Sequence, residues 1–203
     1  MKPIIIVIAV SGMLIPAIAS AELNYNAVQV GYAKTSESGV ADLHEYGIGI
    51  SFSVNNDVFI DGQFSTGRQA SGTAFGDITG TAWAIGAGYH APINNYIDII
   101  ISGGISRATA EIANNSQSGN GYDFGVGIRG EITPGLEGSL SGIYLSMNSN
   151  SSTTTGTGIS AGLGFNVTQQ FQLIADIGSN SYRPQIGPSY STSTLGIGAR
   201  LFF

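Results

Sequence analysis

The sequence contains no cysteine and few charged residues, and both absences narrow its possible functions. Without cysteine, the chain has no disulfide scaffold, no thiolate metal site and no cysteine nucleophile. Only 10% of the 203 residues are charged, and 7 Lys and Arg oppose 13 Asp and Glu, which gives a formal net charge of −6. That balance disfavours a partner held by overall charge, such as a nucleic acid or an anionic lipid surface.

Glycine and apolar residues are plentiful instead. The chain has 30 glycines, about twice the ordinary share, which disfavours a helix-rich domain. Hydrophobic residues make up 42% of the chain and the mean hydropathy is +0.19, so the composition excludes intrinsic disorder. A chain of this length is expected to form one folded domain.

The N-terminal segment has the organisation of a secretory signal peptide. Lys2 precedes a short apolar run, and small side chains at Ala19 and Ala21 favour cleavage after Ala21. The apolar run is short for a membrane-spanning helix, and no later stretch reaches 18 uninterrupted apolar residues. We therefore expect residues 1–21 to be a signal peptide and residues 22–203 to form the folded domain.

The rest of the chain repeats with a period of two rather than 3.6. From Tyr46 to Val54, Tyr, Ile, Ile, Phe and Val alternate with Gly, Gly, Ser and Ser, which is typical of a β-strand with one apolar face. The same alternation returns in residues 122–129, 159–166 and 195–203. The pattern predicts an all-β domain of ten strands, at residues 24–34, 44–54, 57–67, 79–91, 95–107, 121–132, 136–147, 157–167, 170–180 and 192–203.

The predicted connections alternate between short turns and long polar segments. Four are short, such as Asn55-Asn56 and Thr133-Pro134-Gly135. The other five span roughly 9 to 12 residues and include the polar residues 114–120 and 148–155. This layout is typical of a closed, antiparallel, up-and-down transmembrane β-barrel. An even number of strands lets the first and last strand pair, which leaves no open edge.

The apolar face of these strands is predicted to contact lipid. Gly, Ser and acidic side chains cannot fill a core, and about forty large apolar side chains would not fit inside a ten-stranded cylinder. A Lys or Arg that faces lipid at the midplane costs about 2–4 kcal/mol. Every charged residue after residue 21 falls on the inward face, in a connection or at the end of a predicted strand. We therefore expect apolar side chains outside the barrel and polar ones inside.

Outward aromatic residues form two groups separated by aliphatic residues. Two such girdles are expected where aromatic rings lie at the two lipid interfaces. With the N-terminus in the periplasm, the girdle toward the long loops comprises Tyr32, Tyr46, Phe64, Trp83, Tyr122 and Tyr144, and the girdle toward the short turns comprises Phe52, Tyr89, Phe165, Phe171 and Phe203.

Five charged residues on the inward face lie a few residues from a short turn or from the C-terminus. They are Asp61, Asp98, Arg129, Asp176 and Arg200. Because buried charges need partners or water, we expect these residues to form one ion-pair network inside the barrel. The network either holds the wall in register or forms a constriction that favours cations. Most other inward residues are Gly, Ala or Ser, which leaves room for a thread of water.

Three segments resemble known outer-membrane proteins. Residues 25–32 and 86–93 resemble segments of the small monomeric barrels of the OmpX-type and opacity-type superfamily. The chain also ends in alternating apolar residues, which resemble the end-strand signal that the barrel-assembly machinery reads in Gram-negative outer-membrane barrels. These residues are Ile197, Ala199, Leu201 and Phe203.

The resemblance implies a location and partners as well as a fold. It implies a monomer in the bacterial outer membrane, surrounded by outer-membrane lipid and lipopolysaccharide and handled by the barrel-assembly machinery during biogenesis. Many members of the superfamily have eight strands, so eight strands are the alternative to ten. Members include adhesins, narrow pores and proteins of no assigned role, and the resemblance therefore does not select a function.

Two functions are compatible with the sequence. The first is a small passive barrel that supports envelope integrity, with at most a narrow, cation-leaning pore for water or small solutes. The alternative is a surface-exposed adhesin or receptor that acts through its polar loops. We expect no cofactor, metal or enzymatic activity, because His44 and His90 are predicted at opposite interfaces. A rim enzyme built on His44 with Asp42 and Glu45 is the one catalytic arrangement to consider.

Overall fold

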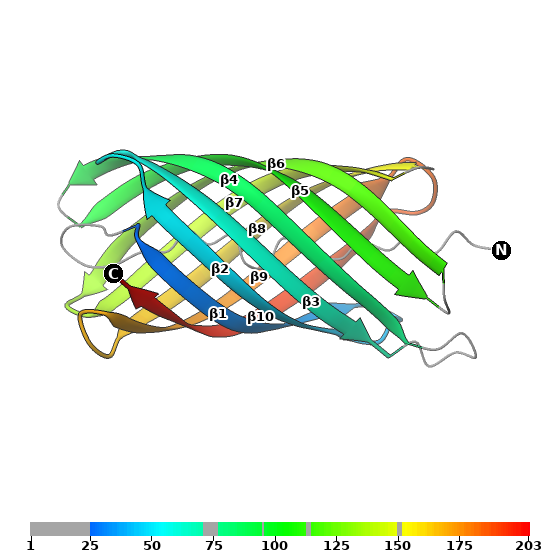
Figure 1. Cartoon of the computed structure of the whole chain (residues 1–203), viewed down its shortest axis with the longest axis horizontal. Helices are drawn as coiled ribbons and strands as arrows, with labels where there is room; N and C mark the ends of the chain where they lie inside the picture. The colour runs from blue at the N-terminus through cyan, green and yellow to red at the C-terminus, as the bar shows by residue number, and fades with distance from the viewer. Residues whose placement is uncertain (1–24, 71–76, 95, 113–114, 150–151) are drawn as a thin grey trace.

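The computed structural model describes residues 25–70, 77–94, 96–112, 115–149 and 152–203, which form one closed β-barrel (Figure 1). The predicted signal peptide, residues 1–21, lies outside the described residues. The part of the chain that the structure describes contains no helix long and apolar enough to cross a membrane. The strands are β1 (Ala27–Glu37), β2 (Leu43–Ser53), β3 (Val58–Gln69), β4 (Ile78–Asn94), β5 (Ile97–Ile112), β6 (Asn115–Thr133), β7 (Leu136–Ser149), β8 (Ser152–Asn166), β9 (Phe171–Pro184) and β10 (Tyr190–Phe202).

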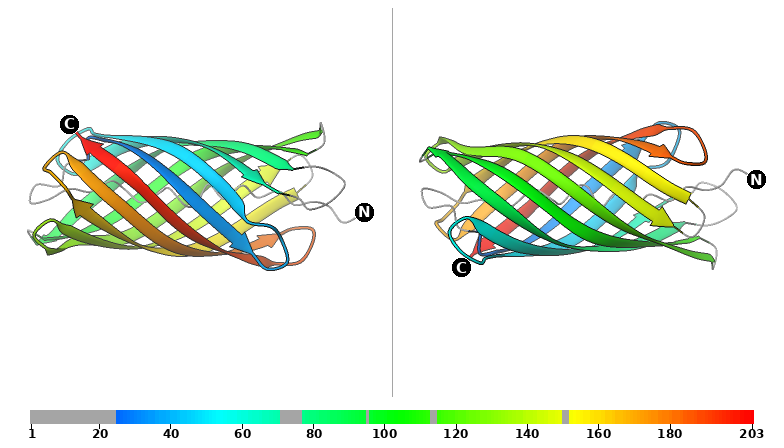
Figure 2. Two further views of the ribbon diagram at one scale, coloured as in Figure 1. Left: turned by 90° about the horizontal axis from the view of Figure 1, so that it is seen from below. Right: turned by 90° about the horizontal axis from the view of Figure 1, so that it is seen from above.

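Each strand pairs in antiparallel fashion with its sequence neighbours, and β1 also pairs with β10 to close the barrel. Ala27 at the start of β1 lies opposite Phe202 at the end of β10, at the end of the barrel that we call the terminal end. The β2–β3, β4–β5, β6–β7 and β8–β9 turns lie at the terminal end, and the other connections lie at the opposite, distal end (Figure 2). The ten-stranded barrel is confirmed, and the eight-stranded alternative is wrong.

The terminal turns are closed by the residues that their turn chemistry requires. Asn55 Oδ1 accepts hydrogen bonds from the backbone N–H groups of Asp57 (2.9 Å) and Val58 (2.8 Å). Gly135 adopts a φ of +82° between β6 and β7, a conformation that residues with a side chain rarely adopt. These short turns hold neighbouring strands in register from the terminal end upward.

The wall of the barrel is apolar outside and polar or small inside. Ile48, Val126 and Leu163 face outward, with exposed fractions of 49%, 51% and 54%. Asp98 and Gln172 face inward and are completely buried. Because successive side chains of a strand point to opposite faces, the alternation in sequence becomes a difference between exterior and lumen. An exterior with so many large apolar side chains is the surface that lipid requires.

The strands extend farther at the distal end than the sequence pattern predicts. We expect loops at residues 114–120 and 148–155, but residues 115–120 belong to β6 and residues 152–155 belong to β8. Residue 114 and residues 150–151 lie outside the described residues. Beyond the lipid both faces of a strand meet water, so the apolar alternation stops while the backbone ladder continues. A prediction from alternation therefore ends these strands too early.

The lipid-facing wall can be tested with a charge on the outer face of β2. Replacing Ile48 with Arg is expected to destabilise the folded barrel by about 2–4 kcal/mol, because Ile48 lies between the outward residues Tyr46 and Phe52. The matched control is Thr66→Arg, because Thr66 lies opposite Tyr46, where the cost falls to about 0–1 kcal/mol. Urea unfolding of the barrel in lipid vesicles measures both changes. Equal destabilisation by the two variants would contradict a lipid-facing wall.

Candidate functional site

Tyr25 reaches across the lumen at the terminal end of the barrel. Its ring stacks between Phe59 of β3, with centroids 4.6 Å apart, and His90 of β4, with centroids 4.3 Å apart. Its hydroxyl donates a hydrogen bond to Asp98 Oδ2 (3.4 Å), and Arg129 Cζ lies 5.2 Å from the ring centroid. Asp98 and Arg129 belong to β5 and β6, on the side of the barrel opposite β1. We call these five residues the plug.

The plug is tightly packed. Tyr25, Asp98 and Arg129 are 1%, 0% and 2% exposed. Ser51 Oγ donates a hydrogen bond to the backbone carbonyl of Tyr25 (2.6 Å), which ties the segment that precedes β1 to β2. The Phe59 ring packs against Gly88 of β4, where the absence of a side chain leaves space for it. A Cβ at Gly88 would overlap the ring. Packed side chains therefore fill the terminal end of the lumen.

Asp98 and Arg129 are direct partners in the β5–β6 ladder, and both point inward. The residues that the structure describes place no carboxylate oxygen within 4.0 Å of the Arg129 guanidinium; the Tyr25 ring lies beside it instead. His90 Nδ1 lies 3.3 Å from Asp98 Oδ2. The two opposite charges therefore interact through a buried space that the Tyr25 side chain shares with them.

Arg200 lies on the β1 side of the lumen and has partners of its own. Its Nη1 donates to Gln172 Oε1 (2.7 Å), and its Nη2 donates to Gln29 Oε1 (3.1 Å). Glu137, Gln172, Asp176 and Arg200 line part of a cavity of about 50 Å³. A water molecule needs about 10–15 Å³ on this measure, so the cavity has room for only a few waters.

Three carboxylates line the lumen farther toward the distal end. Asp61 of β3 and Asp123 of β6 lie on one ladder row that passes through Gly86 and Gly104. A Cβ at Gly86 would lie 3.0 Å from Asp61 Oδ1, and a Cβ at Gly104 would lie 3.3 Å from Asp123 Oδ1, so the two carboxylates lean toward each other over the glycines. Asp176 of β9 lies over a glycine of β10 in the same way. This part of the lumen is acidic.

The five charged residues expected in one network lie in two zones. Asp98, Arg129 and Arg200 lie toward the terminal end, the first two in the plug and Arg200 beside Gln29 and Gln172, whereas Asp61 and Asp176 line the lumen farther toward the distal end. Asp61 and Asp176 make no ion pair with either arginine within the described part of the chain. The distance of each residue from a turn in the sequence did not reveal these two zones, because the order of the strands around the barrel decides which inward residues meet.

Sequence reasoning missed four lumen residues: Tyr25, His90, Asp123 and Glu137. Asp123, Glu137 and His90 have the inward parity of their strands, so the alternation itself contained the signal for them. The placement of His90 at a lipid interface is wrong, because its side chain faces the lumen and is 8% exposed. Tyr25 has the inward parity of the first predicted strand, residues 24–34, although β1 itself begins at Ala27; its contacts across the lumen are visible only in the closed barrel.

The residues of the hypothetical rim enzyme do not come together. His44 faces outward, and its Nδ1 lies 2.6 Å from the Tyr32 hydroxyl, whereas Glu45 faces the lumen and is 3% exposed. Asp42 forms an ion pair with Lys34 instead (2.7 Å). In residues 25–70, 77–94, 96–112, 115–149 and 152–203 there is no group of three or more His, Asp or Glu that could hold a metal ion.

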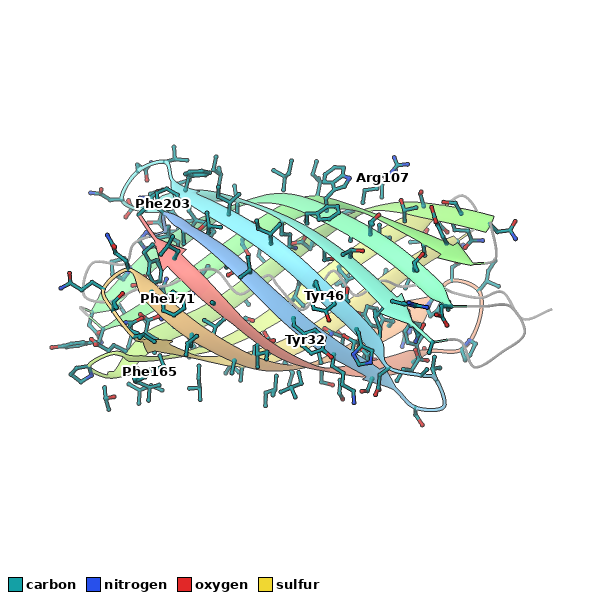
Figure 3. All side chains as sticks on the ribbon, turned by 60° about the horizontal axis from the view of Figure 1, so that its bottom comes forward. Tyr32, Tyr46, Arg107, Phe165, Phe171 and Phe203 are labelled. Carbon is teal, nitrogen blue, oxygen red and sulfur yellow. The ribbon has the colours of Figure 1, made fainter. Side chains whose placement is uncertain are left out.

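Outward aromatic residues occur toward both ends of the barrel. Figure 3 shows Tyr32 and Tyr46 nearer the distal end than Phe165, Phe171 and Phe203. The Tyr32 and Tyr46 rings lie 5.3 Å apart, and the Phe203 ring lies 5.8 Å from that of Phe52. Phe64, Trp83, Tyr89, Tyr122 and Tyr144 are also exposed, as are Tyr96 and Phe124, which were not assigned to either girdle. The exposed residues of the C-terminal strand include Ile197 and Leu201, with Ala199 on the same face.

Comparisons with known proteins agree with this architecture. A family model described as "Outer membrane protein beta-barrel domain" matches residues 5–203. An outer membrane channel from Pseudomonas putida F1 has a similar fold, with a TM-score of 0.58 and 10% identity over 93% of this chain and 97% of that chain. Neisserial surface protein A gives a TM-score of 0.46 and 16% identity over 87% of this chain and 95% of that one. The attachment invasion locus protein of Yersinia pestis gives a TM-score of 0.36 and 17% identity over 86% of this chain and 95% of that one. No curated protein matches.

Proposed function

Since this chain belongs to the outer membrane protein beta-barrel domain family and lies in the bacterial outer membrane, we propose that it is a small passive barrel that supports envelope integrity. It has at most a narrow, cation-leaning pore for water or small solutes. The plug carries this proposal, because Tyr25 extends across the lumen to Asp98 and Arg129 on the opposite wall. A barrel whose terminal end is filled in this way suits a scaffold or a narrow conduit rather than a wide porin.

The cation preference follows from the charges that line the lumen. Asp61, Asp123 and Asp176 line the lumen beyond the plug. Both buried arginines lie closer to the terminal end, where Asp98 and Glu137 oppose their charge. Walls of low polarity concentrate the field of these acids, which attracts cations to the lumen and repels anions.

Recordings from planar bilayers test the proposed function. The refolded protein is expected to give small conductance steps or none, and a salt gradient is expected to give a reversal potential of the sign that cation preference predicts. The double variant Asp61→Asn and Asp176→Asn removes two acids without adding bulk, so any cation preference is expected to fall. Large, non-selective steps from the unmodified protein would contradict the proposal.

We further propose a monomer without enzymatic activity, surrounded by outer-membrane lipid and lipopolysaccharide. The separation of His44 from Glu45 supports a role without catalysis. Ile197, Leu201 and Phe203 continue the exposed apolar face to the end of the chain, which supports recognition of this strand by the barrel-assembly machinery.

A surface receptor is the second candidate function, and the distal ends of the strands favour it. β6 and β8 continue through polar residues, and Thr109 Oγ1 and Ser118 Oγ lie 3.0 Å apart across β5 and β6. These extensions hold polar side chains on an ordered frame rather than on loops. Adsorption of phage or host cells to bacteria that express the protein tests this role, with Gln117→Ala and Ser118→Ala as variants that keep the strand.

A further inference from the structure

The basic residues of the described chain are sorted by the face on which they lie. Arg129 and Arg200 are buried in the lumen. The other basic side chains face outward near the distal end, because each shares the parity of outward apolar or aromatic residues on its strand. They are Lys34 on β1, Arg68 on β3, Arg107 on β5 and Arg183 on β9.

Three potentially cationic side chains form a row across neighbouring strands. Lys34 lies directly opposite His44, and His44 lies directly opposite Arg68. Since neighbouring strands are about 4.8 Å apart, this row spans about 10 Å of the outer surface. Tyr32 and Tyr46 precede the row on the lipid side, so the row lies just beyond the aromatic residues that mark an interface.

Arg107 adds a further cation to the same side of the barrel. It lies opposite Trp83 in the β4–β5 ladder. Figure 3 shows Arg107 on the outside, nearer the distal end than Phe203. Within the described residues, no carboxylate forms an ion pair with Arg107. Glu111 is also exposed on β5, but it lies four residues farther toward the distal end.

Two of the cations are held by acids of neighbouring connections. Lys34 pairs with Asp42, and Arg68 pairs with Asp77. The ammonium of Lys34 lowers the pKa of Asp42, so this pair stays charged at neutral pH. The side chains of Lys34 and Arg68 remain 43% and 72% exposed, which leaves N–H donors directed to the surroundings. The acids therefore position these cations without covering them.

We propose that Lys34, Arg68 and Arg107 form a docking site for the phosphate groups of lipopolysaccharide in the outer leaflet. Side chains just beyond an aromatic girdle lie at headgroup depth, and guanidinium groups bind phosphate oxygens through paired N–H donors. No basic side chain faces outward in the terminal half of the described strands, so the site serves one leaflet. The net charge of −6 conceals it, because the lumen and the connections hold most of the acids. An anionic headgroup at this surface meets the local positive charge rather than the overall balance of the chain.

Titration of refolded protein with lipopolysaccharide in detergent tests this site. Trp83 is the single tryptophan of the chain and lies opposite Arg107, so its fluorescence reports binding at the right place. For the double variant Arg68→Gln and Arg107→Gln, we expect apparent affinity to fall at least about tenfold. Arg107→Lys, which retains the charge beside Trp83, is expected to keep most of the affinity. Dephosphorylated lipopolysaccharide is expected to bind weakly to the unmodified protein.

Arg183→Gln is the matched control, because Arg183 lies on β9, on the other side of β1 from Arg68 and Arg107, and has the same charge near the same end. It is expected to bind lipopolysaccharide as the unmodified protein does. Unchanged affinity of the double variant, an equal loss in Arg183→Gln, or equal binding of dephosphorylated lipopolysaccharide would each overturn the proposal. The mobility of unheated samples in gels shows that each variant is folded.

The docking site rests on the lipopolysaccharide surroundings proposed above but is independent of the proposed pore. Bilayer recordings on the double variant are expected to match those of the unmodified protein, so failure of one proposal is distinguishable from failure of the other. Orientation is testable separately, because the chain has no cysteine. A cysteine introduced at Ser38, in the distal β1–β2 connection, is expected to react with an impermeant thiol reagent on intact cells.

Discussion

Replacing Tyr25 with Ala is expected to raise the conductance of the barrel at least several-fold. The Tyr25 ring lies between Phe59 and His90, and its hydroxyl reaches Asp98 on the opposite wall. Truncation removes the side chain that bridges the lumen, whereas Phe59 lies flat over a glycine of β4 and does not fill the gap. Single-channel recordings in planar bilayers measure this effect, and osmotic swelling of vesicles provides a second measurement.

Tyr182→Ala is the matched control for this experiment. Tyr182 is also 1% exposed in the lumen, but its ring stacks on Tyr190 of the adjacent strand (5.1 Å) and so lies along the wall. Its removal is expected to change conductance much less than removal of Tyr25. Equal conductance of the two variants would mean that the plug does not limit passage through the barrel.

Replacing Arg129 with Leu is expected to destabilise the barrel by about 3–5 kcal/mol. Asp98 is completely buried opposite Arg129, and the substitution leaves its carboxylate without the cation across the ladder. Asp98→Leu is expected to have a similar effect, because it leaves the buried Arg129 guanidinium without the carboxylate of Asp98 opposite it. Urea unfolding in lipid vesicles measures both changes, and Arg183→Leu serves as an exposed control expected to stay within about 0.5 kcal/mol.

The double variant Arg129→Leu and Asp98→Leu shows whether the two charges depend on each other. Because it removes both charges at once, we expect it to be more stable than the sum of the single effects by about 0.5–3 kcal/mol. Additive losses would show that Arg129 and Asp98 are stabilised independently of each other and would contradict coupling between these two charges.

The sequence predicted the wall of this barrel well because lipid imposes a simple rule. Each outward position that crosses the hydrocarbon must be apolar, and each neighbour along the strand must point the other way. Tyr46 to Val54 shows that rule without interruption, and the structure places Ile48 outside as expected. The rule stops where lipid ends, so residues 115–120 were expected in a loop although they continue β6.

The lumen was harder to predict because several arrangements satisfy the same alternation. Inward parity identified Asp61 and Asp98 alike, yet Asp98 lies against Tyr25 whereas Asp61 leans toward Asp123. Which inward residues meet depends on the order and register of strands around the ring, and these relations join residues far apart in the chain. Tyr25 and Arg129, 104 positions apart by number, are one such pair.

The amino-acid sequence alone determined the all-β class and the apolar exterior, since both follow from the alternation that surrounding lipid requires, and it favoured ten strands over eight; closure of the sheet decided between those two numbers. Tertiary structure decided the filling of the terminal end, the separation of the lumen charges into two zones and the row of Lys34, His44 and Arg68. These features arise only when closure of the sheet brings β1 into register with β2 and β10 and sets it across the lumen from β6.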